Sequence, residues 1–392
     1  MHGSAGMKNL ILDKVAYAIK HYPIVQILYR GVLSSLFKLV GLFIITDERL
    51  VLLVSYGGKQ YSDSPKVMFE TMKQDARFKH MTYVWAFENP EDIQIEGAKK
   101  IQINSLSYFI TALKAKVWIT NVNIERGLNF KKKNTIYLNT WHGTGPKKGG
   151  NAVKGRKDYD FSRVDIFCCD GEYTKTVFKK WFNAKEENMV ACGRPREDEL
   201  LKFTSNDRIA IRKKLKIPAN KKVCLYMPTW REYGNQPINL DKWNDALSAE
   251  YILLVRAHHF AQDNVFSSCQ SGFWRDVSNY SNVNELYCVA DVLISDYSSA
   301  FFDYGLLGKP MICYAYDYRD YEESTGLFID LRKEFPNGII EREDDVISFV
   351  QNMNYEEECI KTQKFCKKYI SRPDNATQIC LDALYDKWEQ KV

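Results

Sequence analysis

Short apolar runs alternate with helical patterns along most of the chain after residue 50. The run 50–56 is continuous and apolar, as strands are when both faces of a parallel sheet are buried. Because helical patterns separate most of the runs, the sequence predicts doubly wound α/β units. The expected strands of the first unit are 50–56, 82–87, 116–121, 135–138, 164–169 and 189–192, and those of the second are 223–227, 251–255, 292–294 and 310–314.

Two Rossmann-like domains are expected from this division. We place the N-terminal domain at 49–200 and the C-terminal domain at 201–392, the latter including a C-terminal helix. Polar residues follow several expected strands in both domains, and open parallel sheets bind ligands beyond the carboxyl ends of their strands. The simplest arrangement therefore has the two domains facing each other across a cleft.

The segment before the first domain, 7–48, has a different pattern. Apolar residues recur at helical spacing, and basic residues lie between them. The uninterrupted apolar stretch 39–45 is far shorter than the roughly 20 residues of a membrane span. The pattern predicts a basic amphipathic arm that lies on an anionic membrane surface. The alternative is that these helices pack on the protein's own core.

Candidate chemistry is most concentrated in the stretch 139–150, which reads NTWHGTGPKKGG and follows an apolar run. A plain turn needs one or two glycines and no paired cations. Gly143 lets the backbone come close to a ligand, and Lys147 supplies positive charge where a helix could begin. His142 adds a titratable group beside them. The stretch suits a phosphate-bearing substrate, although its spacing matches neither a P-loop nor a dinucleotide fingerprint.

Two further groups follow expected strands of the second domain. Arg256 and His258 lie two residues apart on an extended segment and point the same way, which suits a diphosphate; the alternative is an incidental histidine at a strand end. Ser298 or Ser299 could cap the next helix or bind an anion there. Asp303, about one turn further on, would hold hydroxyls or a base, because a carboxylate repels phosphate.

Two basic segments leave their role open. Arg194 and Arg196 bracket a proline after an expected strand, which describes either a rigid phosphate clamp or a solvated loop. A basic run is either a solvated face or a guide for a polyanionic acceptor; it consists of Lys147, Lys148, Lys154, Arg156 and Lys157.

Composition narrows the class of protein only in part. The chain has 392 residues, a net charge of +6 and a pI of about 8.6. This balance fits an anionic substrate, an anionic membrane or nucleic acid, and it chooses none of them. The 10 cysteines are scattered without a CxxC pair, so the spacing predicts neither a zinc site nor a disulfide framework.

Several motifs taken together identify a family. TWHGT with a following lysine pair, MPTWR, RAH, SDYSSAFFDYGLLGKPMICYAYD and GLFIDL occur in this order, and GKQYSDSPK precedes them. Over roughly residues 50–385 the chain resembles the CDP-glycerol glycerophosphotransferase family, the bacterial polymerases and primases of teichoic acids and capsules. The resemblance implies a GT-B fold, a CDP-activated polyol phosphate as donor, and peripheral attachment to the cytoplasmic face of the cell membrane.

The resemblance also assigns roles to single residues. His142 matches the family's catalytic base and His258 the histidine of its RxH motif, so both are expected to be catalytic. The chain departs from the family pattern at two places: it reads HGTGPK where the family has HGTPLK, and GRPRED where the family has GYPRND. These departures affect which donor and acceptor are expected, but not the expected reaction class. The expected substrate-binding residues are Gly143, Thr144, Lys147, Arg196, Thr229, Arg256, Ser298, Ser299 and Asp303.

The expected reaction is a phosphoryl transfer. A hydroxyl of a lipid-linked acceptor attacks the β-phosphorus of a CDP-polyol and CMP leaves, with His142 handling the hydroxyl proton. Glycerol phosphate is the expected unit and ribitol phosphate the alternative. A GT-B glycosyltransferase that uses a nucleotide sugar, or a non-catalytic module that binds polyanions, would be a different class.

The expected partners follow from this reaction. They are an undecaprenyl-diphosphate-linked polymer and an anionic membrane surface. No metal, cofactor or nucleic acid is expected, and homo-oligomerisation is left open.

Overall fold

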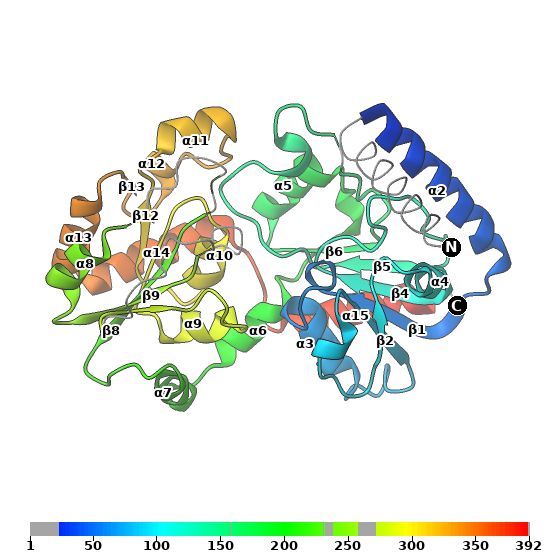
Figure 1. The fold of residues 1–392 in the computed structure, drawn as a ribbon, viewed down its shortest axis with the longest axis horizontal. Coiled ribbons are helices and arrows are strands. Elements are labelled where there is room, and N and C mark those ends of the chain that lie inside the picture. The colour runs from blue at the N-terminus through cyan, green and yellow to red at the C-terminus, as the bar shows by residue number, and fades with distance from the viewer. Residues whose placement is uncertain (1–22, 158, 230, 232–237, 258–271, 391–392) are drawn as a thin grey trace, which may run out of the picture.

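The computed structural model describes residues 23–157, 159–229, 231, 238–257 and 272–390. They form two α/β units that lie side by side, each built on one parallel sheet (Figure 1). The predicted α/β class with parallel sheets is confirmed. Between the units lies α6 (Pro195–Lys202), which contacts helices of both.

The first sheet has seven strands in the order β3-β2-β1-β4-β5-β6-β7, and all neighbouring pairs are parallel. The order reverses between β1 and β4, which makes the carboxyl ends of these strands a topological switch point, where ligands bind in open α/β sheets. The strands are β1 (Asp47–Val54), β2 (Thr82–Phe87), β3 (Lys99–Gln102), β4 (Ala115–Thr120), β5 (Ile136–Asn139), β6 (Ile166–Cys169) and β7 (Met189–Ala191).

Helices cover both faces of this sheet. On one face, α4 (Leu106–Lys114) and α5 (Glu172–Phe182) share a core with β1 and β4. On the other face, α3 (Asp63–Met72) and α15 (Ala376–Glu389) enclose a second core. The strands are therefore apolar on both faces, as the continuous hydrophobic runs predicted. Short 3₁₀ turns are η1 (Tyr56–Gly58), η2 (Pro90–Asp92), η3 (Gly150–Ala152) and η4 (Glu186–Asn188).

The second sheet has six parallel strands in the order β10-β9-β8-β11-β12-β13. Its switch point lies between β8 and β11. The strands are β8 (Lys222–Met227), β9 (Tyr251–Val255), β10 (Trp274–Asp276), β11 (Val292–Ser295), β12 (Met311–Tyr314) and β13 (Ile339–Ile340). The helices are α7 (Ser205–Lys214), α8 (Leu240–Leu247), α9 (Val283–Val289), α10 (Ala300–Gly305), α11 (Tyr318–Ser324), α12 (Leu331–Glu334), α13 (Glu343–Asn352) and α14 (Tyr355–Tyr369).

The C-terminal helix does not stay with the second unit. After α14 the chain returns to the first unit, where Cys380, Leu381 and Leu384 of α15 pack in the core beneath the first sheet. The division at residue 200 placed this helix in the C-terminal domain, and for α15 that expectation is wrong. The helix buries its apolar side against β-strands more than 180 residues earlier in the chain, which no local pattern reveals.

Three strands had no counterpart among the predicted runs. They are β3, β10 and β13, and each lies at an edge of its sheet. β3 reads KKIQ and β10 reads WRD, so neither has a continuous apolar run. An edge strand is covered less completely than a central one, and its composition is correspondingly more polar.

The helix α2 (Pro23–Phe43) lies along the outer edge of the first unit (Figure 1). Its inner side packs through Phe37, which stacks on Phe109 with ring centroids 4.6 Å apart. Its outer side is apolar and exposed, as at Leu42 and Phe43, which are 78% and 81% exposed. Within the described residues, no helix is both long and apolar enough to cross a membrane. Residues 7–22 of the expected arm lie outside the described residues.

Candidate active site

His142 lies in the loop after β5, at the carboxyl edge of the first sheet. Its Nδ1 is 2.8 Å from the carbonyl oxygen of Asn121, which follows β4. A carbonyl oxygen can only accept, so Nδ1 carries the proton and Nε2 keeps a free lone pair. Burial lowers the pKa of His142, and this effect outweighs the opposite effect of the Asn121 hydrogen bond. At neutral pH the ring is therefore an uncharged imidazole with a basic Nε2.

The switch point of the first sheet fixes this ring. The Oδ1 of Asn121 accepts the backbone N–H of Tyr56 at 2.8 Å, which joins the loops after β1 and β4. The rings of Tyr56 and His142 lie 5.7 Å apart. Tyr56 has a φ of +45°, an uncommon conformation for a residue with a side chain. The three loops after β1, β4 and β5 thus hold one another at the site.

Gly143 allows the two units to approach closely at this point. Its φ is +149°, and a Cβ placed there would lie 2.6 Å from the Oγ of Ser299 in the second unit. Both observations require glycine. The sequence predicted a close approach to a ligand at Gly143, whereas the group that comes closest is Ser299.

Arg196 forms an ion-pair network that joins the units. One terminal nitrogen donates to Asp63 at 2.6 Å and to the carbonyl oxygen of His142 at 2.9 Å. The other donates to both carboxylate oxygens of Asp303 at 2.8 Å. Both terminal nitrogens are occupied, so this arginine holds the His142 loop against the second unit. Arg196 and Asp303 were expected to bind substrate, but in the structure they bind each other.

Arg194 extends the same network. It is 1% exposed and pairs with the carboxylates of Asp170 and Glu197. It also donates to the Oγ1 of Thr144 at 3.0 Å and lies 3.4 Å from Asp303. Of the two interpretations of this segment, a solvated loop is excluded by burial. Thr144, which is fully buried, acts here as an internal acceptor.

A second cluster surrounds Asp296 at the switch point of the second sheet. Asp296 accepts the backbone N–H of Thr229 at 2.9 Å and pairs with Arg231 at 3.0 Å. Arg231 in turn pairs with Asp317 at 2.6 Å. From the first unit, Lys147 reaches this cluster: burial lowers its pKa, while the charge of Asp296 acts in the opposite direction. The backbone of Lys147 also forms a bridge with Leu327 of the second unit.

Three other residues were expected at the site, and they are not part of the two clusters described above. The Oγ of Ser298 accepts the N–H of Ala300, the first residue of α10, which is the capping alternative. Arg256 donates to the carbonyl oxygen of Tyr280 at 2.7 Å and lines a pocket with Tyr56. His258 lies outside the described residues.

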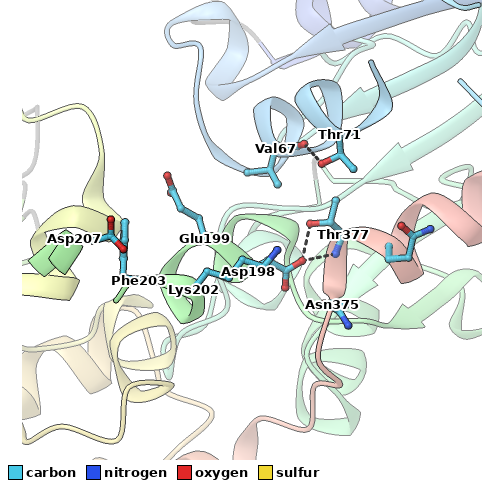
Figure 2. A pocket seen from close by; sticks show the side chains of 10 residues that line it. Val67, Thr71, Asp198, Glu199, Lys202, Phe203, Asp207, Asn375 and Thr377 are labelled. Atoms are coloured by element: carbon cyan, nitrogen blue, oxygen red, sulfur yellow. Dashed lines mark hydrogen bonds between the residues drawn. The ribbon is translucent and has the colours of Figure 1, made fainter. Parts of the chain in front are cut away.

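A pocket of about 530 Å³ lies where α3, α6 and α15 meet (Figure 2). Its best-buried polar group is Asp198, which accepts from the N–H and the Oγ1 of Thr377 at 2.7 and 2.6 Å. These bonds fasten the start of α15 to α6. None of the residues expected at the active site lines this pocket, so we assign it to the attachment of the C-terminal helix.

One cluster of potential metal ligands occurs among the residues that the structure describes. Cys168, Cys192 and Cys380 bring their sulfur atoms within 4.8 Å of one another in the core under α15. No spacing in the sequence predicts this cluster, because Cys380 lies about 190 positions or more from the other two. All three are fully buried and none of the expected site residues belongs to the cluster.

Several residues of the site had no sequence prediction of their own. Asn121 and Asp170 directly follow β4 and β6, so the rule that polar residues after strands mark a site could have found them. Asp63 lies in the GKQYSDSPK motif and adopts a φ of +62°. Its role as the partner of Arg196 depends on residues 133 positions apart and has no local signal.

Comparison with known proteins gives this site a context. Residues 36–379 match the family of CDP-glycerol:poly(glycerophosphate) glycerophosphotransferases. The chain belongs to this family. The recognition from sequence motifs is confirmed, and so is the assignment to glycerophosphotransferase-type enzymes.

Individual members of the family are similar over most of this chain. The teichoic acid glycerol-phosphate transferase of Staphylococcus aureus is 30% identical, over 82% of this chain and 90% of that protein. The teichoic acid poly(glycerol phosphate) polymerase of Staphylococcus epidermidis is 32% identical over 76% of this chain, which spans only 46% of that longer protein. A structure of the wall teichoic acid polymerase TagF superposes with a TM-score of 0.82 at 30% identity, covering 91% of this chain and 93% of that one.

Proposed function

We propose that this glycerophosphotransferase moves glycerol phosphate from CDP-glycerol to a hydroxyl of a lipid-linked, teichoic-acid-type acceptor and releases CMP. The observation that carries the proposal is the state of His142, a neutral imidazole whose Nε2 is free because Nδ1 is engaged by Asn121. A general base needs this arrangement, and it lies at the switch point where open α/β sheets bind their ligands.

The step balances as a displacement at phosphorus. The acceptor oxygen forms a bond to the β-phosphorus of the donor while the bond from that phosphorus to the bridging oxygen breaks. The bridging oxygen leaves with CMP and takes both electrons. The proton of the attacking hydroxyl passes to Nε2 of His142. Positioning and stabilisation of charge account for most of the catalysis in transfers of this type.

Cations of both units are available for the phosphates. Lys147 lies beside Asp296 of the second unit, and Arg256 donates only to backbone carbonyls among the described residues. We propose that Lys147, with Thr229 and His258, holds the donor diphosphate, and that Arg256 faces the phosphates of the acceptor. Arg196 and Asp303 then act as positioning residues, which set the distance between the base and the second unit. This is a GT-B-type division, with the base on one unit and the donor on the other.

The outer side of α2 supports peripheral attachment to the cytoplasmic face of the membrane. Its exposed apolar residues include Ile27, Leu28, Val32, Leu36, Leu39, Leu42 and Phe43. Lys38 is exposed on the same helix, and Arg30 is half-buried. An apolar helix face with adjacent cations suits the interface of an anionic bilayer. A lipid-linked acceptor, which we take to carry undecaprenyl diphosphate, would then be presented at the same surface.

A donor panel tests the proposal. CMP release is measured with CDP-glycerol, CDP-ribitol and UDP- or GDP-sugars, each with a synthetic lipid-diphosphate acceptor. We expect turnover with CDP-glycerol and a fall of about 10²–10⁴-fold in kcat for His142→Ala, with CDP-glycerol still bound. Preference for CDP-ribitol would change the alditol, and preference for a nucleotide sugar would change the reaction class. Unchanged turnover of His142→Ala would remove the assigned base.

A further inference from the structure

A pocket of about 460 Å³ lies between the two units beside Tyr56. One wall is the segment from η1 through α3, and the opposite wall is Arg256 with the start of α9. Arg196 and Glu199 of α6 complete it. The volume is within the range of about 300–1,000 Å³ that is usual for sites that bind small molecules.

Two cations in this pocket form no ion pair with a carboxylate among the described residues. The ammonium group of Lys66 lies 5.4 Å from the ring centroid of Tyr61 and forms no ion pair within the described part of the chain. Arg256 donates to the carbonyl oxygens of Val277 and Tyr280 and likewise has no described carboxylate within ion-pair distance. Glu70 lies close enough for the charge of Lys66 to lower its pKa, but it is bonded to Lys73, so both Lys66 and Arg256 can still donate to an anionic ligand.

The carboxylates of the pocket are already engaged. Asp63 is held by Arg196 at 2.6 Å, and Glu70 by Lys73 at 2.7 Å. Glu199 accepts from the Nδ2 of Asn284 at 2.8 Å. Glu199 keeps its charge, so the lining as a whole is balanced, and Lys66 and Arg256 are the cations in it that form no ion pair with a described carboxylate.

The rest of the lining suits a polyol. Amides and hydroxyls dominate it, and they can bond to alcohol groups in either direction. They belong to Gln60, Ser62, Thr71, Gln74, Ser281, Asn282 and Asn284. Two cations that form no ion pair, together with such groups, match a chain in which phosphodiesters alternate with alcohols.

The pocket adjoins the proposed base. Tyr56 lines it, and its ring is 5.7 Å from the ring of His142. Arg196 also lines it and donates to the carbonyl oxygen of His142. In contrast, Thr229, Ser298 and Ser299, which were expected to bind the donor, do not line it. An occupant of this pocket would thus reach His142 past Tyr56 and Arg196 without contacting these positions.

We propose that this pocket binds the acceptor chain, with the phosphodiester behind the attacking hydroxyl held by Lys66 and Arg256. The inference rests on the proposed function and adds the site of the acceptor to it. Lys66 is then a specificity-determining residue, because it recognises an acceptor that already carries polyol phosphate. The donor's diphosphate remains on the side of Thr229 and Lys147.

The test measures KM for each substrate separately in Lys66→Gln. The acceptors are soluble lipid-diphosphate analogues that carry one or three glycerol phosphate units, and CMP release is the readout. We expect KM for the acceptor to rise about tenfold, with kcat and KM for CDP-glycerol within twofold of wild type. Lys66→Arg should keep most of the affinity. The matched control is Lys79→Gln, an exposed lysine of the same unit that does not line the pocket.

Salt gives an independent readout. Because the contact is to a phosphate, KM of the wild type for the acceptor should rise with ionic strength, and more weakly so in Lys66→Gln. If Lys66→Gln instead raises KM for CDP-glycerol, the pocket binds the donor. If KM for the acceptor and KM for CDP-glycerol are both unchanged, Lys66 and this pocket take no part in substrate binding. Either result overturns the inference. Wild-type protein that releases no CMP would instead contradict the proposed function, and circular dichroism of each variant establishes that it is folded.

Discussion

The network around Arg196 gives the sharpest test of how the two units are held. Replacing this residue by methionine keeps most of the volume but removes the charge. Asp303 would keep Arg194, 3.4 Å away, whereas Asp63 would keep only neutral donors, chiefly the hydroxyl of Tyr56 at 2.6 Å. The side chain of Asp63 is 3% exposed, so its charge cannot return to water. The loss of stability on substitution therefore comes mainly from the uncompensated charge of Asp63.

The size of the effect follows from this geometry. Leaving one partner of a buried ion pair uncompensated costs about 3–5 kcal/mol. With a urea dependence of about 3 kcal/mol per M, the upper end of the usual range, the midpoint of unfolding should fall by about 1–2 M. Unfolding is followed by circular dichroism and tryptophan fluorescence. Adding Asp63→Asn to Arg196→Met removes the orphaned charge and should recover about half of the lost stability.

Measuring kcat distinguishes the contribution of Arg196 to stability from its role in positioning the His142 loop. The double variant still lacks the donor to the carbonyl oxygen of His142, so kcat should stay well below that of the wild type although stability has returned. If the double variant unfolds at the same urea concentration as Arg196→Met, the buried charge of Asp63 is not the source of the instability. If its kcat equals that of the wild type, Arg196 does not position the His142 loop.

Three further predictions address the base, the contact between the units and the outer helix. Because burial lowers the pKa of His142, kcat/KM should rise with pH through a midpoint below the ordinary histidine value of about 6.5 and then level off; a midpoint above that value would contradict the assignment. Gly143→Ala would place its Cβ 2.6 Å from the Oγ of Ser299, so kcat should fall at least tenfold, and Ser299→Gly in the same chain should recover only part, since the φ of +149° remains strained. Phe43→Ser should weaken sedimentation with anionic vesicles at least tenfold without lowering Tm, because this side chain is 81% exposed; equal binding would exclude α2 from the membrane contact.

Much of the fold could be predicted because both sheets are parallel and largely buried. Strands covered on both faces need continuous apolar runs, and 82–87 and 251–255 coincide with β2 and β9. What escaped prediction lacks that constraint. The edge strand β3 is polar, and α15 reveals nothing in its own sequence about packing against a sheet that begins at Asp47.

The candidate site could be located from the sequence, but the pairing of its charges could not. A strand that leads into His142, or into Asp296, marks the carboxyl edge of a parallel sheet. Asp296 does follow β11 at the switch point of the second sheet, and His142 contacts Asn121 at that of the first. At such a position, an arginine is expected to bind a phosphate, and an aspartate is expected to bind a hydroxyl. Each such assignment assumes that the side chain is free.

Whether a side chain is free depends on residues far away in the sequence. Arg196 is bound by Asp63 and Asp303, which lie 133 and 107 positions from it, and the three meet only where α6 lies between α3 of the first unit and α10 of the second. Lys66 and Arg256, in contrast, are held by no described carboxylate. Opposite charges that neutralise one another fix the geometry of a site, while cations left over are available to a phosphate. The distinction between residues that hold this site together and residues that bind its substrate therefore follows from the charges that remain unpaired, which only the folded chain determines.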